Sequence, residues 1–176
     1  MLLERLFRPR PAREAGRALY ARAVEQARRP ALYADLGVPD TGEGRFEAYS
    51  LHVVLLLDRL RAQGPEAGEV SQSLFDAYVK DLDHALREMG VGDLSVGRKM
   101  RRLGEAFYGR GKSYDAAFAA LPDVGPLEAL LVRTVYAGAA AAAAPRLAAY
   151  VTAQRQALAA QPLDELVAGR AAWSGV

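Results

Sequence analysis

Apolar side chains recur along most of this chain at intervals of three, four or seven residues, the spacing of one face of an α-helix. Residues 95–121 give the clearest example, with one narrow stripe that carries Val96, Met100, Leu103, Phe107, Tyr114, Phe118 and Leu121. Residues 66–89 carry a second stripe, made of Val70, Leu74, Tyr78, Leu82, Ala85 and Met89. No segment shows the alternation of a strand, so we predict an all-α, single-domain bundle of about six helices.

The other predicted helices differ in how much of their surface is apolar. Residues 44–63 are apolar around most of the circumference, which predicts a central, buried helix. Residues 11–29 have only a weak apolar face, so we expect that helix near the surface. A fifth helix is predicted from residue 127, and Pro145 is expected to end or kink it before a sixth runs to about residue 160.

The predicted helices suggest how the chain is divided. We assign residues 1–30 to an N-terminal arm and first helix, and residues 31–150 to the main helical domain. Residues 151–176 would form the end of the last helix and a loose tail. Leu2, Leu3, Leu6 and Phe7 could lie on one apolar face, which is compatible with an interfacial anchor or with a frayed terminus.

Glycines are concentrated between the two striped helices. The dinucleotide-binding fingerprint requires a third glycine where this chain has Ser95, and a strand before it, so we do not predict a phosphate-binding loop. Gly90 is instead placed to end one helix in a left-handed conformation. Asp93 or Ser95 could cap the next helix. The sequence therefore predicts a tight hairpin between two antiparallel helices.

Three further glycines, Gly97, Gly104 and Gly111, are spaced by seven along one flank of the second striped helix. A glycine inside a helix costs roughly 1 kcal/mol relative to alanine, which is tolerable where another backbone must approach closely. We expect a helix of this chain to occupy the flank; a partner's helix is the alternative. A Gly104→Leu substitution would abolish folding in the first case and only binding in the second.

Charge is segregated although the formal net charge is only +2. Residues 66–93 carry seven acidic and two basic side chains, whereas residues 94–112 carry one acidic and six basic ones. We expect two neighbouring helices with complementary faces; a surface for polyanions is the alternative. The basic side chains opposite the apolar stripe are Arg98, Arg101, Arg102 and Lys112.

Candidate chemistry is scarce. The chain has no cysteine and only two histidines, His52 and His84, whose positions do not have paired-ligand spacing, so we predict no metal site. His52 lies on the buried helix and is expected to be a core residue with one hydrogen-bond partner; a binding or pH-sensing role is the alternative. No catalytic motif or cofactor signature is present, so an enzyme is not predicted. No apolar run approaches the about 20 residues that a bilayer requires.

Three stretches together resemble one known family: LYADLGVPDTGEGRFEAYSLHVVLLLDRL (32–60), FDAYVKDLDHALREMGVGDLSVGRKMRRLGEAFYGR (75–110) and LEALLVRTVYAG (127–138). The resemblance is to the ubiquinol–cytochrome c chaperone family, the assembly factors of ubiquinol–cytochrome c reductase, and it is closer to the bacterial form. It implies an all-helical, non-enzymatic chaperone without a cofactor. Mitochondrial members bind newly made cytochrome b, work with a small partner and associate with the ribosome.

For this chain, the resemblance implies cytochrome b or another membrane-protein client, with the ribosome or a small helper protein as further candidate partners. It implies no DNA binding, a cytoplasmic location that could include the inner face of the membrane, and at most peripheral membrane contact. The alternative is a helical protein that binds an apolar small molecule or lipid in a closed cavity. The candidate partner-binding residues, from the resemblance, the charge pattern and the glycine spacing, are His52, Asp81, Arg98, Lys99, Arg101, Arg102, Gly104, Tyr108 and Arg133.

Overall fold

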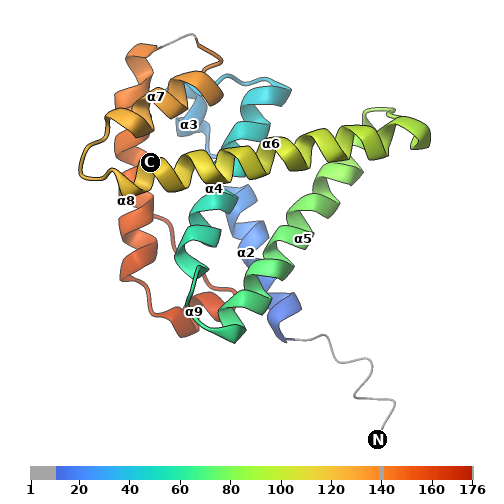
Figure 1. Cartoon of the computed structure of the whole chain (residues 1–176), viewed down its shortest axis with the longest axis horizontal. Helices are drawn as coiled ribbons and strands as arrows, with labels where there is room; N and C mark the ends of the chain where they lie inside the picture. Colours follow the sequence, from blue (N-terminus) through green and yellow to red (C-terminus); the bar gives the residue numbers. More distant parts are fainter. Residues whose placement is uncertain (1–10, 139–140, 176) are drawn as a thin grey trace, which may run out of the picture.

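The computed structural model of this protein describes residues 11–138 and 141–175 (Figure 1). These residues form only helices and connections, which confirms the all-α, single-domain prediction. The N-terminal stretch with the candidate anchor lies outside the described residues. The helices are α2 (Pro11–Ala27), α3 (Pro30–Ala34), α4 (Gly42–Leu60), α5 (Pro65–Glu88), α6 (Asp93–Ala119), α7 (Gly125–Thr134), α8 (Ala144–Ala160) and α9 (Leu163–Val167), with a 3₁₀ turn at Ala141–Ala143.

Local sequence explains where several helices begin and end. The Thr41 hydroxyl accepts a hydrogen bond from the Gly44 amide at 3.1 Å and so caps the start of α4. Pro145 lies in the first turn of α8, where a missing amide donor costs nothing. It therefore begins a helix, whereas we had expected it to end or kink the preceding one. The helix α7 has already ended at Thr134.

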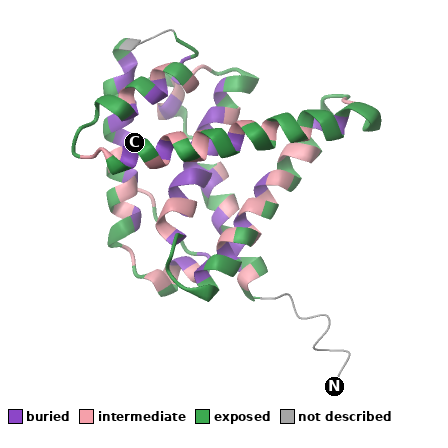
Figure 2. Ribbon diagram, viewed as in Figure 1, coloured by how far each residue is buried: buried purple, intermediate pink, exposed green. Residues whose placement is uncertain are grey.

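The centre of the bundle is α4, as predicted: eleven of its nineteen residues are buried (Figure 2). The helix α2 lies at the surface with one face, as expected, but its other face belongs to the core. Its Leu19, Ala23 and Ala27 are buried. A Cβ atom on Gly16 would come within 2.5 Å of the Leu74 amide nitrogen, so α2 and α5 approach each other closely at this glycine.

The C-terminal tail is docked, not loose as expected. The Trp173 indole donates a hydrogen bond to the Arg22 carbonyl oxygen at 3.1 Å, which ties the tail to α2. The Gln154 side chain accepts from the Ser174 amide at 2.9 Å. Ala171, just before these two residues in the chain, is buried. The end of the described chain therefore closes one side of the core.

Candidate functional site

The helices α5 and α6 form the predicted hairpin. Gly90 ends α5 with a φ of 80°, the left-handed conformation that favours glycine. Gly92 is the N-cap of α6, and no side chain caps this helix, so the expected caps Asp93 and Ser95 do not act as such. The Asp93 carboxylate instead accepts a hydrogen bond from Arg87 and ties the two sides of the turn together.

Residues 80–106, here called the distal hairpin, extend away from the bundle (Figure 1). Within it only Leu86 and Val96 are buried. The apolar stripe of α5 was predicted to continue to Met89, but Ala85 and Met89 are exposed. The stripe repeats in the sequence beyond the point where the core ends, so its last members have no core to enter.

Two large apolar side chains at the end of the distal hairpin are exposed to solvent. Met89, the last residue before the turn, is 72% exposed, and Leu94, just after it, is 97% exposed. We call these two residues the tip. Exposure of such side chains on both sides of one turn is unfavourable in water, and it is typical of a surface that binds a protein or a membrane.

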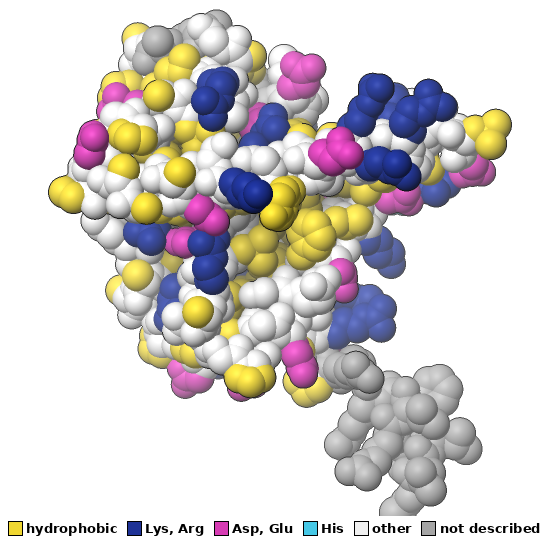
Figure 3. All heavy atoms as spheres, viewed as in Figure 1, with side chains coloured by type: hydrophobic (Ala, Val, Ile, Leu, Met, Phe, Trp, Pro, Cys, Tyr) yellow, Lys and Arg dark blue, Asp and Glu magenta, His cyan; other side chains and the backbone are white. Residues whose placement is uncertain are grey.

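A group of cations lies beside the tip (Figure 3). Within the described residues, none of them forms an ion pair or a side-chain hydrogen bond, although all are exposed. The expectation that the acidic and basic segments would pair across the two helices is therefore wrong for these side chains. We call them the hairpin cations: Arg98, Lys99, Arg101 and Arg102.

Hydrophobic side chains also gather in the angle between α5 and α6 (Figure 3). On these two helices, Phe75 and Val79 of α5 are partly exposed, and Tyr108 of α6 is 66% exposed. We call these three residues the apolar angle. The Phe75 ring rests on the buried ring of Phe107, with centroids 5.5 Å apart, and Lys112 lies 4.7 Å from the Tyr108 ring centroid.

The glycine flank of α6 is open. A Cβ atom added at Gly97, Gly104 or Gly111 would meet nothing within 4 Å. Our expectation that another helix of this chain occupies the flank is therefore wrong. Gly104 and Tyr108 are separated by one helical turn on the same side of α6, so the flank and the apolar angle form one continuous surface.

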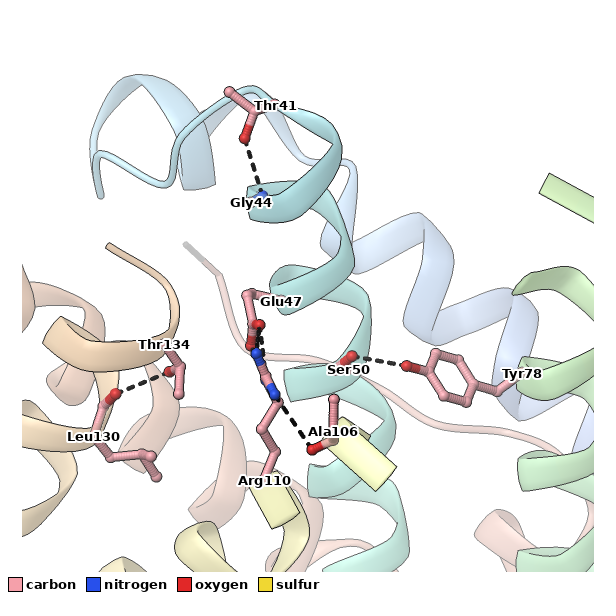
Figure 4. Close-up of polar contacts among 9 residues, drawn as sticks. All are labelled: Thr41, Gly44, Glu47, Ser50, Tyr78, Ala106, Arg110, Leu130 and Thr134. Carbon is pink, nitrogen blue, oxygen red and sulfur yellow. Dashed lines mark hydrogen bonds and ion pairs between the residues drawn. The ribbon is translucent and has the colours of Figure 1, made fainter. Parts of the chain in front are cut away.

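Two polar contacts with α4 hold this surface in place (Figure 4). The Arg110 guanidinium of α6 donates to both carboxylate oxygens of Glu47, whose residue is only 5% exposed. The Ser50 and Tyr78 hydroxyls are 2.8 Å apart and join α4 to α5. Both helices of the hairpin are thus fixed to the central helix on the bundle side of the distal hairpin, at Tyr78 and Arg110.

The remaining predicted site residues lie apart from the hairpin surface or on its edge. Asp81 of α5 accepts a hydrogen bond from the Tyr20 hydroxyl at 2.6 Å, and burial together with this bond raises the Tyr20 pKa. Arg133 is exposed on α7. His84 is exposed, with its Nε2 3.2 Å from a carboxylate oxygen of Glu88, whereas His52 is buried.

His52 is fully buried and is a scaffold residue, with two hydrogen-bond partners where one was expected. Its Nδ1 lies 2.7 Å from the Ala48 carbonyl oxygen, so this nitrogen carries the hydrogen. Its Nε2 then accepts from the Tyr150 hydroxyl at 2.7 Å, and Tyr150 in turn accepts from Gln26 at 2.9 Å. Every group in this chain of bonds is satisfied only while the imidazole is neutral.

We expect His52 to make the fold sensitive to acid. Burial lowers its pKa from 6.5 to about 4, so the unfolded chain binds a proton at this residue at a higher pH than the folded chain does. The contribution of neutral His52 to the free energy of unfolding is therefore fully present above about pH 6.5. It is lost as the pH drops towards 4, by roughly 3 kcal/mol in total. Chemical denaturation across this range should show a shallower pH dependence for His52→Gln, and equal slopes would refute the assignment.

An open cleft lies where α2, α3 and the start of α4 meet. It encloses about 570 Å³ and is lined by Arg28, Pro30, Tyr33, Ala34, Asp40 and Arg45. Arg45 and Asp40 form an ion pair at 2.6 Å within it. A closed, apolar cavity would have favoured the small-molecule alternative, whereas this cleft is open and holds a charged pair.

Comparison with known proteins identifies the family. The chain matches the model of the Ubiquinol-cytochrome C chaperone family over residues 34–173. It belongs to that family. It is also similar to the Cbp3 homolog from Brucella abortus, whose crystal structure superposes with a TM-score of 0.87 at 36% identity, covering 99% of this chain and 97% of that one. A search of curated proteins gave no match.

Membership of the ubiquinol–cytochrome c chaperone family supports a chaperone role in assembly and implies a non-enzymatic protein. Among the described helices, none is long and apolar enough to cross a membrane. Sequence reasoning found the basic segment and Tyr108, but it assigned Phe75, Val79 and Leu94 no role. Their exposure depends on where the core ends, which periodicity does not reveal.

Proposed function

We propose that this ubiquinol–cytochrome c chaperone binds newly made cytochrome b and holds one of its apolar helices in the apolar angle. The observation that carries the proposal is the exposed surface formed by the apolar angle and the open glycine flank. Proteins often recognise an apolar or amphipathic helix by packing its apolar face against an exposed apolar surface. The family membership supports the client, because it connects the chain with assembly of the ubiquinol–cytochrome c system.

The geometry suits a client helix better than a small ligand. The side chains of the apolar angle are wholly or partly exposed to solvent, so a long segment could contact them without entering a cavity. Glycines at Gly104 and Gly111 leave space for a second backbone to come close, as small residues do in helix pairs within membranes. The cost of those glycines to the free chaperone would be recovered when a client covers them.

A pair of glycine substitutions tests this proposal. We expect Gly104→Leu to leave the fold intact, because a Cβ atom at this position would meet nothing within 4 Å, and to weaken client capture at least about tenfold by blocking the flank. Gly109→Leu is the matched control, since Gly109 is equally open but points away from the apolar stripe on the same helix. Circular dichroism checks the fold, and co-purification of cytochrome b from the native host measures capture.

Three results would contradict the proposal. The first is an unmodified chaperone that recovers no cytochrome b under gentle extraction. The second is an equal loss of capture with Gly109→Leu and Gly104→Leu. The third is capture that survives a Phe75→Ser, Val79→Ser, Tyr108→Ser variant, since that variant removes the apolar angle but leaves the buried rings of Tyr78 and Phe107 in place.

A further inference from the structure

The tip and the hairpin cations have no role in the client-binding surface described above. The tip exposes Met89 and Leu94 on the two sides of one turn. The hairpin cations begin four residues after Leu94 and, within the described part of the chain, have no acidic partner. Nothing in the fold requires either feature, because the distal hairpin is held together by the buried Leu86 and Val96 and by the Arg87–Asp93 pair.

We propose that the distal hairpin docks on an anionic lipid bilayer. The tip enters the boundary between headgroups and acyl chains, and the hairpin cations lie among the lipid phosphates. An apolar wedge with flanking Lys and Arg side chains is the combination that holds peripheral proteins at such surfaces. Each cation near an anionic leaflet contributes attraction, and the apolar side chains add a contribution that salt does not screen.

The arrangement of the two features favours a bilayer over a nucleic acid. At about 100° per residue, Leu94 falls on the same face of α6 as Arg98 and Arg101. Phosphates of RNA would satisfy the cations and leave the apolar tip in water. The tip also lacks the aromatic side chains on which bases stack. A bilayer covers both the charged and the apolar parts with one surface.

The dimensions of the hairpin permit this contact. From Leu94 to the core residue Phe107, the helix rises about 20 Å at about 1.5 Å per residue. An interfacial segment enters the headgroup region by only about 5–10 Å. The tip can therefore be inserted while the bundle remains clear of the headgroups. The apolar angle, at the base of the same hairpin, would then open near the membrane surface.

The position of the apolar angle near the membrane matters only if the proposed client function holds. Lipid binding by the distal hairpin does not depend on a client. The test uses the purified full chain and vesicles without any client, so it succeeds or fails independently of cytochrome b capture. Vesicles of phosphatidylcholine alone are compared with vesicles that also contain phosphatidylglycerol, at low and at raised salt. Sedimentation with the vesicles gives the bound fraction.

Three variants make the test specific. The first replaces the four hairpin cations with glutamine, and the second changes the tip to Met89→Ser, Leu94→Ser. The third, a matched control, removes the same number of exposed positive charges elsewhere through Arg13→Gln, Arg17→Gln, Arg29→Gln and Arg146→Gln. All the substituted positions are exposed, so circular dichroism should show an unchanged helical content for every variant.

We expect the unmodified chain to bind vesicles that contain phosphatidylglycerol and to bind phosphatidylcholine alone at least about tenfold more weakly. The cation variant and the tip variant should each lose about tenfold or more in affinity, while the control keeps most of it. The proposal is overturned if the unmodified chain ignores anionic vesicles, or if the control loses as much as the cation variant. It is also overturned if the tip variant binds normally, because the cations would then serve a polyanion such as RNA.

Discussion

Replacing Arg110 with alanine is expected to lower the free energy of unfolding by about 4 kcal/mol. The substitution leaves the Glu47 carboxylate, in a residue that is 5% exposed, without the guanidinium that donates to both of its oxygens at 2.7 and 2.6 Å. An uncompensated buried charge is more costly than the pair is favourable. The hydrogen bond to Glu47 also raises the Arg110 pKa, as expected for a guanidinium held by a carboxylate.

Chemical denaturation followed by circular dichroism measures this loss. Arg61→Ala is a suitable control, because Arg61 forms an ion pair with Asp115 in which both side chains are more than a third exposed. Such a surface pair is worth at most about 1 kcal/mol. A double variant, Glu47→Leu with Arg110→Met, should recover much of the stability lost in Arg110→Ala. Equal effects of Arg61→Ala and Arg110→Ala would show that the Glu47 site is not desolvated as described.

Replacing Gly16 with valine is expected to lower the free energy of unfolding by at least about 4 kcal/mol, enough to unfold a marginally stable domain. A Cβ atom here would lie 2.5 Å from the Leu74 amide nitrogen and 2.5 Å from the Ser73 Cβ. The obstructing atoms include α5 backbone, so relief requires α2 and α5 to move apart. That movement would also open the contacts of Leu19 and Ala23 with the core.

Gly97→Val is the matched comparison for the Gly16 substitution. Gly97 also lies inside a helix, but a Cβ atom there meets nothing within 4 Å. Its replacement should change the free energy of unfolding by less than about 1 kcal/mol, since only helix propensity is altered. Thermal and chemical denaturation of the two variants would contradict the described packing if Gly97→Val proved as damaging as Gly16→Val.

The two sets of glycines illustrate what the sequence could and could not reveal. The regularly spaced glycines of α6 predicted a close approach to another helix, whereas the single glycine of α2 was assigned no role. In the structure the close approach of two helices is at Gly16, and Gly97, Gly104 and Gly111 are open. Spacing describes one helix, whereas close packing depends on the position of a second helix. The weak apolar face of α2 was also misleading. Alanine and glycine contribute little hydropathy, yet their small size allows another helix to pack closely.

In the hairpin, too, some features could be predicted from the sequence and others could not. Its helices, its turn and the left-handed Gly90 could be predicted, since they depend on residues near one another in the chain. The exposure of Met89 and the partner of Arg110 could not, because they depend on where α4 and the core lie relative to the hairpin. The same limit applied to the C-terminal tail, whose Trp173 is fixed by a carbonyl group 151 residues earlier.

The docked tail carries an intrinsic fluorescent probe. Trp173 is the single tryptophan, and its ring centroid lies 5.3 Å from that of His52 in an edge-to-face arrangement. A protonated imidazole quenches indole fluorescence more strongly than a neutral one does. Emission from this one fluorophore should therefore register both the release of the tail and the charging of the histidine beneath it, without any added label.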